Sequence, residues 1–227
     1  ATFTLHSPGA APQRVKLNVF GAHQVSNALA AAAVGMECGI DPAVVAEALS
    51  DAHSVSVNRM DVNTRPDGVT VINDAYNANP ESMRAGIAAL GFTAAARPGV
   101  RSVAVLGEMG ELGEDSVRAH AALAEELARY RVTNLVTVGF NPATEALARA
   151  ARDQGVQTLE AADATEAAAQ VEQLLAAPPA GVEGWHERRD RDVVLVKASN
   201  ALGLWAVAER LLRPHTLGSA EEKQAGR

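Results

Sequence analysis

A carboxylate, a phenol and three amides lie together directly after a short apolar run of the chain. The run covers residues 69–72 and is mostly β-branched, which is typical of a buried strand. Asp74 and Tyr76 follow, and then Asn79 and Pro80, which suit the N-cap and the first turn of a helix. Because α/β sheets bind ligands where strands lead into helices, we expect a site here, and helix N–H groups favour an anion. The alternative is an Asx-rich turn that only caps the helix.

Lys197 and Ser199 form a second candidate group, directly after the apolar run 193–196. A lysine that leaves a buried strand suits a carboxylate, and a serine hydroxyl can hydrogen-bond the same ligand. A solvated lysine beside a serine-capped helix start explains the same pattern. The residues alone leave both interpretations open.

The glycine-rich stretch 107–113 reads GEMGELG and invites comparison with the dinucleotide-binding fingerprint. That fingerprint needs glycine two positions after the first glycine, and Met109 stands there. Glu108, Glu111 and Glu114 would also repel phosphate. A nicotinamide dinucleotide site is therefore disfavoured.

His23 and Asn27 lie four residues apart near the start of an alanine-rich helix predicted over residues 25–38. They share a helix face, so both can reach one ligand, although capping of the helix start explains them as well. Arg59 stands beside a predicted strand, where a single arginine is usually solvated. Cys38 is the single cysteine, so it forms no internal disulfide and no zinc motif, which fits a reducing compartment.

Composition narrows the class of protein. The chain has 227 residues, 48% of them hydrophobic, with a net charge of -7 and a pI near 5.4. The sequence has no stripe of Lys and Arg that could neutralise the phosphate backbone of a nucleic acid, so we expect no nucleic-acid partner. Apolar runs are too short to cross a bilayer and no signal segment opens the chain, so we expect a cytoplasmic protein with no membrane partner. The first residue is Ala1 inside a predicted strand, and from this we expect a fragment.

The rest of the sequence shows patterns typical of strands and of helices. Two N-terminal strands flank a Pro- and Gly-rich loop, and Asp41 and Pro42 start a second short helix after the alanine-rich one. From about Arg101 onward strands and helices alternate, which predicts a doubly wound, mainly parallel sheet. The predicted strands cover 2–6, 15–20, 103–106, 134–138, 157–160 and 193–196, and the predicted helices 25–38, 42–48, 117–130, 142–153, 164–176 and 202–212. Residues 91–101 read as a linker, 184–192 as a solvated loop and 214–227 as a polar tail.

Four stretches together resemble the Mur ligase family. They stand in the family's order and cover residues from about 20 to 212: GAHQVSNALAAAA (21–33), DAYNANPES (74–82), VAVLGEMGELG (103–113) and VLVKAS (194–199). The resemblance implies an α/β fold in which residues 1–92 are the C-terminal part of a P-loop-type central ATP-binding domain. Residues 93–100 would be a linker, 101–213 a Rossmann-like C-terminal domain and 214–227 a tail.

The resemblance also implies an activity. It points to an ATP-dependent amide ligase of peptidoglycan precursor synthesis, which adds D-alanyl-D-alanine to UDP-N-acetylmuramoyl-tripeptide through an acyl phosphate. The site residues that it implies are Asn27 with His23 at the adenine, Arg59 as a catalytic residue at the phosphates, Asp74, Tyr76 and Asn77 along the ribose edge, and Lys197 and Ser199 at the amino substrate. We expect these small molecules as partners, and a monomer.

The sequence contains no Gly-Lys-Ser/Thr motif, because none of its lysines follows a glycine. Lys16 and Lys197 each follow a valine, and Lys223 follows a glutamate. The resemblance places the P-loop and most Mg²⁺ ligands before residue 21, so we assign no metal ligand here and expect this chain alone to be inactive. Two rivals remain in the same superfamily, another Mur ligase and a folylpolyglutamate synthetase. A third is a non-catalytic α/β module that binds a nucleotide or dipeptide.

Overall fold

The computed structural model describes residues 1–18, 23–52 and 58–213. They form an N-terminal unit and a larger α/β unit, each with its own apolar core. Among these described residues, no helix combines the length and the apolar character that crossing a membrane requires.

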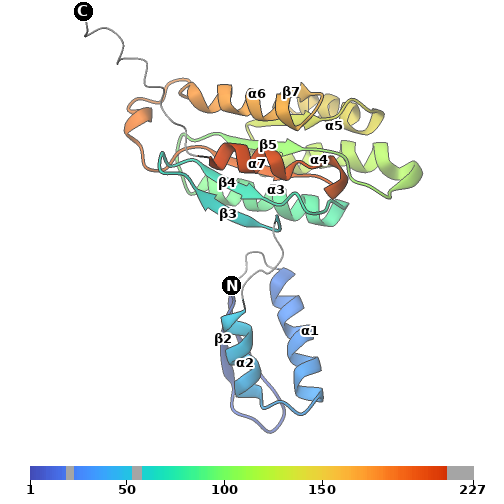
Figure 1. Cartoon of the computed structure of the whole chain (residues 1–227), viewed down its shortest axis with the longest axis vertical. Helices are drawn as coiled ribbons and strands as arrows, with labels where there is room; N and C mark the ends of the chain where they lie inside the picture. The colour runs from blue at the N-terminus through green and yellow to red at the C-terminus, as the bar shows by residue number, and fades with distance from the viewer. Residues whose placement is uncertain (19–22, 53–57, 214–227) are drawn as a thin grey trace, which may run out of the picture.

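The N-terminal unit is a two-stranded sheet packed against two helices (Figure 1). Strands β1 (Thr2–Leu5) and β2 (Gln13–Lys16) are antiparallel, and helices α1 (His23–Glu37) and α2 (Pro42–Asp51) follow. The side chain of Asp41 caps α2, whose first residue is a proline, as the sequence pattern predicts.

The larger unit is built on a six-stranded sheet with the order β3-β4-β8-β5-β6-β7. The edge strand β3 is antiparallel to β4, and every other neighbouring pair is parallel. The strands are β3 (Asp61–Thr64), β4 (Thr70–Asn73), β5 (Ser102–Leu106), β6 (Asn134–Val138), β7 (Gln157–Ala161) and β8 (Val193–Lys197). This confirms the predicted mainly parallel α/β fold.

Helices cover both faces of the sheet (Figure 1). The side chains of Val103 and Val105 pack toward α6 and α7, while those of Ala104 and Leu106 pack toward α3, α4 and α5. The helices are α3 (Pro80–Ala95), α4 (Ser116–Arg129), α5 (Pro142–Asp153), α6 (Ala164–Ala176) and α7 (Trp205–Leu212), with short 3₁₀ turns at Gly113–Asp115, Trp185–Glu187 and Asn200–Leu202. Both faces of the central strands are therefore buried, which explains their continuous apolar sequence.

The linker predicted at 93–100 is wrong, because this segment connects α3 to β5 within one sheet. β4 pairs with β8, and α3 packs on β5 and β8, so the described part of the larger unit begins before residue 92. Packing explains the glycine in this part of the chain. A Cβ atom on Gly91 would lie 2.6 Å from Cβ of Tyr130, so α3 and α4 approach too closely for a larger side chain. Small residues that suggest a flexible segment instead mark a tight helix contact.

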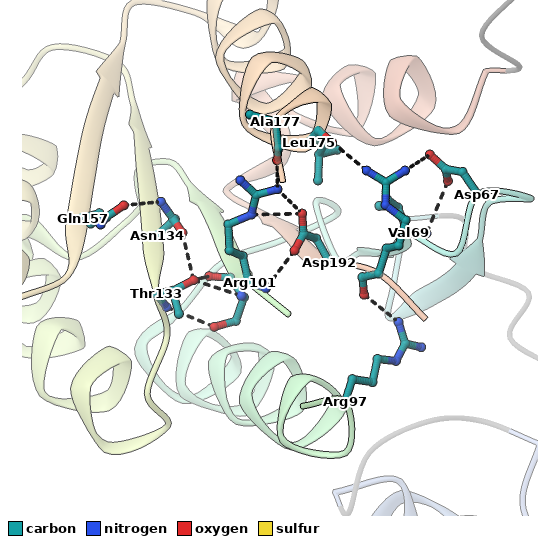
Figure 2. Close-up of polar contacts among 12 residues, drawn as sticks. Asp67, Val69, Arg97, Arg101, Thr133, Asn134, Gln157, Leu175, Ala177 and Asp192 are labelled. Atoms are coloured by element: carbon teal, nitrogen blue, oxygen red, sulfur yellow. Dashed lines mark hydrogen bonds and ion pairs between the residues drawn. The ribbon is translucent and has the colours of Figure 1, made fainter. Parts of the chain in front are cut away.

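The segment predicted as a solvated loop, 184–192, closes the amino edge of the sheet. Asp192 is fully buried and accepts hydrogen bonds from the guanidinium of Arg101, at 2.6 Å from Nη2 (Figure 2). The ring of Trp185 is 2% exposed and lies under the guanidinium groups of Arg101 and Arg191. The charges of Arg188, Asp190, Arg191 and Asp192 are thus paired or stacked on an aromatic ring, whereas Glu187 and Arg189 are exposed as predicted.

Candidate functional site

The carboxyl ends of β4, β8 and β5 lie side by side, and the chain leaves them toward opposite faces. β8 leads to α7 on one face, whereas β4 and β5 lead to α3 and α4 on the other. In parallel α/β sheets, ligands bind at the carboxyl edge where the chain changes direction in this way. The candidate site therefore surrounds the end of β8.

The loop after β4 ends in a capped helix, as its sequence predicts. Oδ1 of Asn79 accepts a hydrogen bond from the backbone N–H of Ser82 at 2.8 Å, and the Ser82 hydroxyl in turn receives the N–H of Asn79 at 3.1 Å. Pro80 is the first residue of α3, and Ala75 and Ala78 are buried beneath the loop. The loop is thus fixed at both ends and along its apolar side.

Asp74 and Lys197 form a buried ion pair that joins this loop to β8. The Lys197 ammonium donates to Oδ2 of Asp74 at 2.5 Å and to the backbone carbonyl of Asn77 at 2.8 Å. The other carboxylate oxygen of Asp74 accepts the backbone N–H of Met60 at 3.0 Å. Lys197 is 1% exposed and Asp74 9%. The sequence-predicted residues Asp74, Asn77 and Lys197 therefore meet in one cluster, in which protein acceptors already surround the ammonium.

Burial lowers the pKa of Lys197 from its ordinary value of 10.5. The carboxylate of Asp74 opposes this shift, because it favours the charged ammonium, and the nearby charge of Arg59 adds to it. The three residues therefore share one electrostatic environment.

Arg59 and Tyr76 lie at the solvent side of the same cluster. The Arg59 guanidinium carbon lies 4.1 Å from the centre of the Tyr76 ring, in a cation–π contact, and both side chains are exposed. The backbone holds them together, because the N–H of Tyr76 donates to the carbonyl of Asn58 at 3.0 Å. An exposed guanidinium held on a ring is available to an anionic ligand.

Ser199 lies on the other side of β8 and contacts the loop after β5. Its backbone N–H donates to the carbonyl of Glu108 at 3.0 Å, and its hydroxyl makes no capping hydrogen bond to the 3₁₀ turn that follows. The alternative interpretation of Ser199 as a helix cap is therefore wrong.

The carboxylate of Glu108 and the amide of Asn141 form a further polar contact at this edge. Oε2 of Glu108 accepts from Nδ2 of Asn141 at 3.1 Å, and Asn141 also caps α5, with Pro142 as the first helical residue. Sequence reasoning missed both residues. The signal was present, because Asn141-Pro142 repeats the pattern of Asn79-Pro80, which marks the start of a helix after a buried strand.

His23 and Asn27 lie on α1, in the N-terminal unit. The side chain of His23 falls outside what the structure describes, and Asn27 is exposed and donates to Oε1 of Gln24 at 3.0 Å. No hydrogen bond or ion pair among the described residues joins α1 to the loop after β4. The structure therefore brings together Arg59, Asp74, Tyr76, Asn77 and Lys197, and shows no contact of Asn27 with them.

The described residues do not provide a site that fits Mg²⁺. No group of three or more His, Cys, Asp or Glu side chains within residues 1–18, 23–52 and 58–213 is placed to hold a metal ion. The carboxylate of Asp74 is already neutralised by the Lys197 ammonium, which a cation would have to displace. We therefore assign no metal to this cluster.

The structure is thus a mainly parallel α/β domain with a cluster of polar and charged side chains at the carboxyl edge of its sheet. Comparison with known proteins identifies the family. Residues 58–200 match the model of the Mur ligase glutamate ligase domain. The chain is 46% identical to a UDP-N-acetylmuramoyl-tripeptide--D-alanyl-D-alanine ligase of Mycobacterium leprae and 48% identical to the ligase of the same name from Mycobacterium tuberculosis, over 92% and 96% of this chain. The chain belongs to the Mur ligase family.

Solved structures agree with this assignment. MurF from Acinetobacter baumannii superposes on 94% of this chain with a TM-score of 0.76 at 26% identity, and covers it with 42% of its own length. MurF from Thermotoga maritima, solved in complex with ADP, superposes on 92% of the chain with a TM-score of 0.62 at 25% identity, using 44% of its own length. The chain likewise spans 41% and 43% of the two mycobacterial ligases, so it corresponds to less than half of each relative.

Proposed function

We propose that this chain is part of an ATP-dependent ligase that joins D-alanyl-D-alanine to UDP-N-acetylmuramoyl-tripeptide. The buried Asp74–Lys197 pair carries the proposal, because it organises the loop 74–79 beside the exposed guanidinium of Arg59 at the ligand-binding edge of the sheet. The identity of 46% and 48% to ligases of that name supports the substrate assignment.

The proposed reaction has two steps. The terminal carboxylate of the tripeptide attacks the γ-phosphorus of ATP, so that an acyl phosphate forms and ADP leaves. The amine of D-alanyl-D-alanine then attacks the acyl carbon, inorganic phosphate leaves and an amide bond forms. Catalysis of this kind depends on placing the reactants and on stabilising charge that moves between phosphate oxygens.

In this proposal the loop after β4 and the neighbouring Arg59 bind the nucleotide. Arg59 contacts the phosphates, because a planar guanidinium can bind two oxygens at once and its side chain is accessible. Asp74 accepts the ribose hydroxyls through the lone pairs that Lys197 and Met60 leave available, and Tyr76 and Asn77 line the same edge. Asn27, with His23, binds the adenine, to which an amide can both donate and accept.

We infer that Lys197 acts by holding Asp74 and Asn77 in place. Lys197 is 1% exposed and its ammonium already has protein acceptors at 2.5 and 2.8 Å, so it serves the nucleotide loop rather than an incoming carboxylate. Ser199, whose hydroxyl makes no capping bond, stays assigned to the amino substrate.

A ligation assay tests the proposal on a ligase that carries this chain together with an N-terminal half like that of its mycobacterial relatives. We expect release of ADP and phosphate, and a product of the expected mass, when ATP, UDP-N-acetylmuramoyl-tripeptide and D-alanyl-D-alanine are all present. L-Alanyl-L-alanine and single amino acids are the control amines. Turnover with a single amino acid but not with D-alanyl-D-alanine would assign the chain to a different Mur ligase.

A further inference from the structure

Two carboxylates flank the end of β8, and their electrostatic surroundings differ. Asp74, after β4, is paired with the ammonium of Lys197. Glu108, after β5, is half-buried and receives the neutral amide of Asn141, and among the described residues it forms no salt bridge. A half-buried carboxylate that lacks a cationic partner favours the binding of a cation from outside the protein.

The direction of the Glu108 carboxylate is set by its neighbour. Oδ1 of Asn141 accepts two backbone N–H groups at the start of α5, from Ala143 and Thr144, both at 3.0 Å. Because this oxygen faces the helix, the NH₂ group of Asn141 must face Glu108, where it donates to Oε2. Oε1 of Glu108 accepts no hydrogen bond within the described part of the chain, so that oxygen is available to a ligand.

The backbone under Glu108 is fixed as well. The N–H of Met109 donates to Nε2 of His120 at 2.8 Å, and Nδ1 of His120 donates to the carbonyl of Ser116 at 2.7 Å. His120 is fully buried and Met109 is 1% exposed. The loop after β5 therefore presents the Glu108 carboxylate from a rigid frame, which favours recognition over adaptable contact.

The surroundings of Glu108 suit a small dipeptide. The backbone N–H of Ser199, whose hydroxyl makes no capping hydrogen bond, donates to the backbone carbonyl of Glu108 at 3.0 Å, so the two residues are neighbours. Phe140 directly precedes Asn141 in the loop after β6 and is 63% exposed, so the loop that supplies the amide partner of Glu108 also presents an apolar ring that can cover a methyl group.

We propose that the Glu108 carboxylate binds the ammonium group of the dipeptide substrate and so orients its nitrogen at the carboxyl edge of the sheet. This inference rests on the proposed function and adds the residue that recognises the amino end of D-alanyl-D-alanine. Glu108 pairs with the charged ammonium as the dipeptide binds, and Asn141 acts as its positioning residue.

A purely structural role predicts different behaviour. If Glu108 only stabilises the start of α5, its replacement lowers the free energy of unfolding and changes binding of every ligand alike. If it binds an ammonium, its replacement acts on the charged dipeptide and spares a dipeptide in which that charge is removed.

The test is calorimetric titration of the 227-residue chain with D-alanyl-D-alanine and with N-acetyl-D-alanyl-D-alanine, which lacks the ammonium. We expect Glu108→Gln to weaken binding of the free dipeptide by about ten- to a hundredfold, the range for a lost hydrogen bond to a charged group, and to leave the acetylated dipeptide at its original weak affinity. Glu114→Gln, an exposed change beyond the same loop, is the matched control and should leave both affinities unchanged. A thermal melt of each variant separates loss of folding from loss of recognition.

Three results would overturn the inference. They are an unchanged affinity of Glu108→Gln for the free dipeptide, equal affinity of the original chain for both dipeptides, and no binding of the free dipeptide at all. The ligation assay judges the proposed function independently. If the ligase that carries this chain is active but Glu108→Gln keeps its affinity for the dipeptide, the proposed function stands and the assignment of Glu108 is wrong.

Discussion

The Lys197 ammonium lies 2.5 Å from Oδ2 of Asp74, although 123 positions separate the two residues in the chain. This contact joins the loop after β4 to the end of β8, and the same ammonium also holds the Asn77 carbonyl at 2.8 Å. The packing allows little movement, because a Cβ atom on Gly86 of α3 would lie 3.1 Å from Cδ of Lys197. The loop and the strand therefore behave as one unit.

Lys197→Met should destabilise the chain by about 3–5 kcal/mol, the usual penalty when one partner of a buried ion pair is removed. The change keeps most of the side-chain volume but leaves the Asp74 carboxylate without its cation, and Asp74 is 9% exposed. Urea denaturation followed by circular dichroism measures the loss.

The double variant Lys197→Met with Asp74→Asn is its control. Because no unpaired charge remains, it should regain a large part of the lost free energy of unfolding, with a coupling of about 0.5–3 kcal/mol between the two changes. Strictly additive effects would show that the pair contributes no net interaction.

Raising the pH should reduce the free-energy cost of burying Lys197. Its folded-state pKa lies below 10.5, mainly through burial, so between these two values the unfolded chain binds more protons than the folded one. The free energy of unfolding contributed by Lys197 therefore rises with pH across that window, and the burial penalty is fully present at lower pH. Denaturation curves of the original chain and of Lys197→Met at several alkaline pH values give the difference, which should grow in favour of the original chain as pH approaches 10.5.

Local sequence signals predicted much of this fold because each depends on neighbouring residues. Asn79-Pro80 and Asp41-Pro42 mark helix starts by supplying a side-chain cap and a preset φ, and both appear as predicted. The apolar runs 103–106 in β5 and 193–196 in β8 follow from burial on both faces of the sheet.

Those local signals do not indicate which strands pair when they are far apart in the sequence. Nothing near residue 70 indicates that β8 inserts between β4 and β5, so residues 93–100 resembled a domain boundary. The same insertion brings Lys197 to Asp74 and makes it a partner of the loop rather than an exposed ligand group. The tight contact of Gly91 with Tyr130 is likewise visible only when both helices are in place.

Arg59→Ala should lower kcat of the ligase more than it raises KM for ATP, because the guanidinium charge matters most when phosphate oxygens gain charge in the transition state. The free energy of unfolding of this variant should change by less than about 0.5 kcal/mol, because the Arg59 side chain is exposed. Steady-state kinetics with varied ATP separate the two parameters.

Arg84→Ala provides the matched control, because Arg84 is an exposed arginine on α3. It should leave both kinetic parameters unchanged. Equal and small effects of the two substitutions would remove Arg59 from the site.

Gly107→Ala should destabilise the chain by about 1–3 kcal/mol, the range for overpacking, and should displace the loop that carries Glu108. A Cβ atom at Gly107 would lie 2.8 Å from Cδ1 of Leu202 and 2.9 Å from Cβ of Ala198, and Ala198 is fully buried. The end of the Leu202 side chain can rotate away, but Cβ of Ala198 is fixed to the backbone, so relief of that contact requires a shift of the segment after β8 or of the loop at Gly107. Gly110→Ala in the same loop is the control, since its Cβ atom would meet nothing closer than 3.9 Å. Thermal melts together with dipeptide titration of the two variants measure both effects, and equal behaviour of the pair would show that the loop adapts where its packing predicts rigidity.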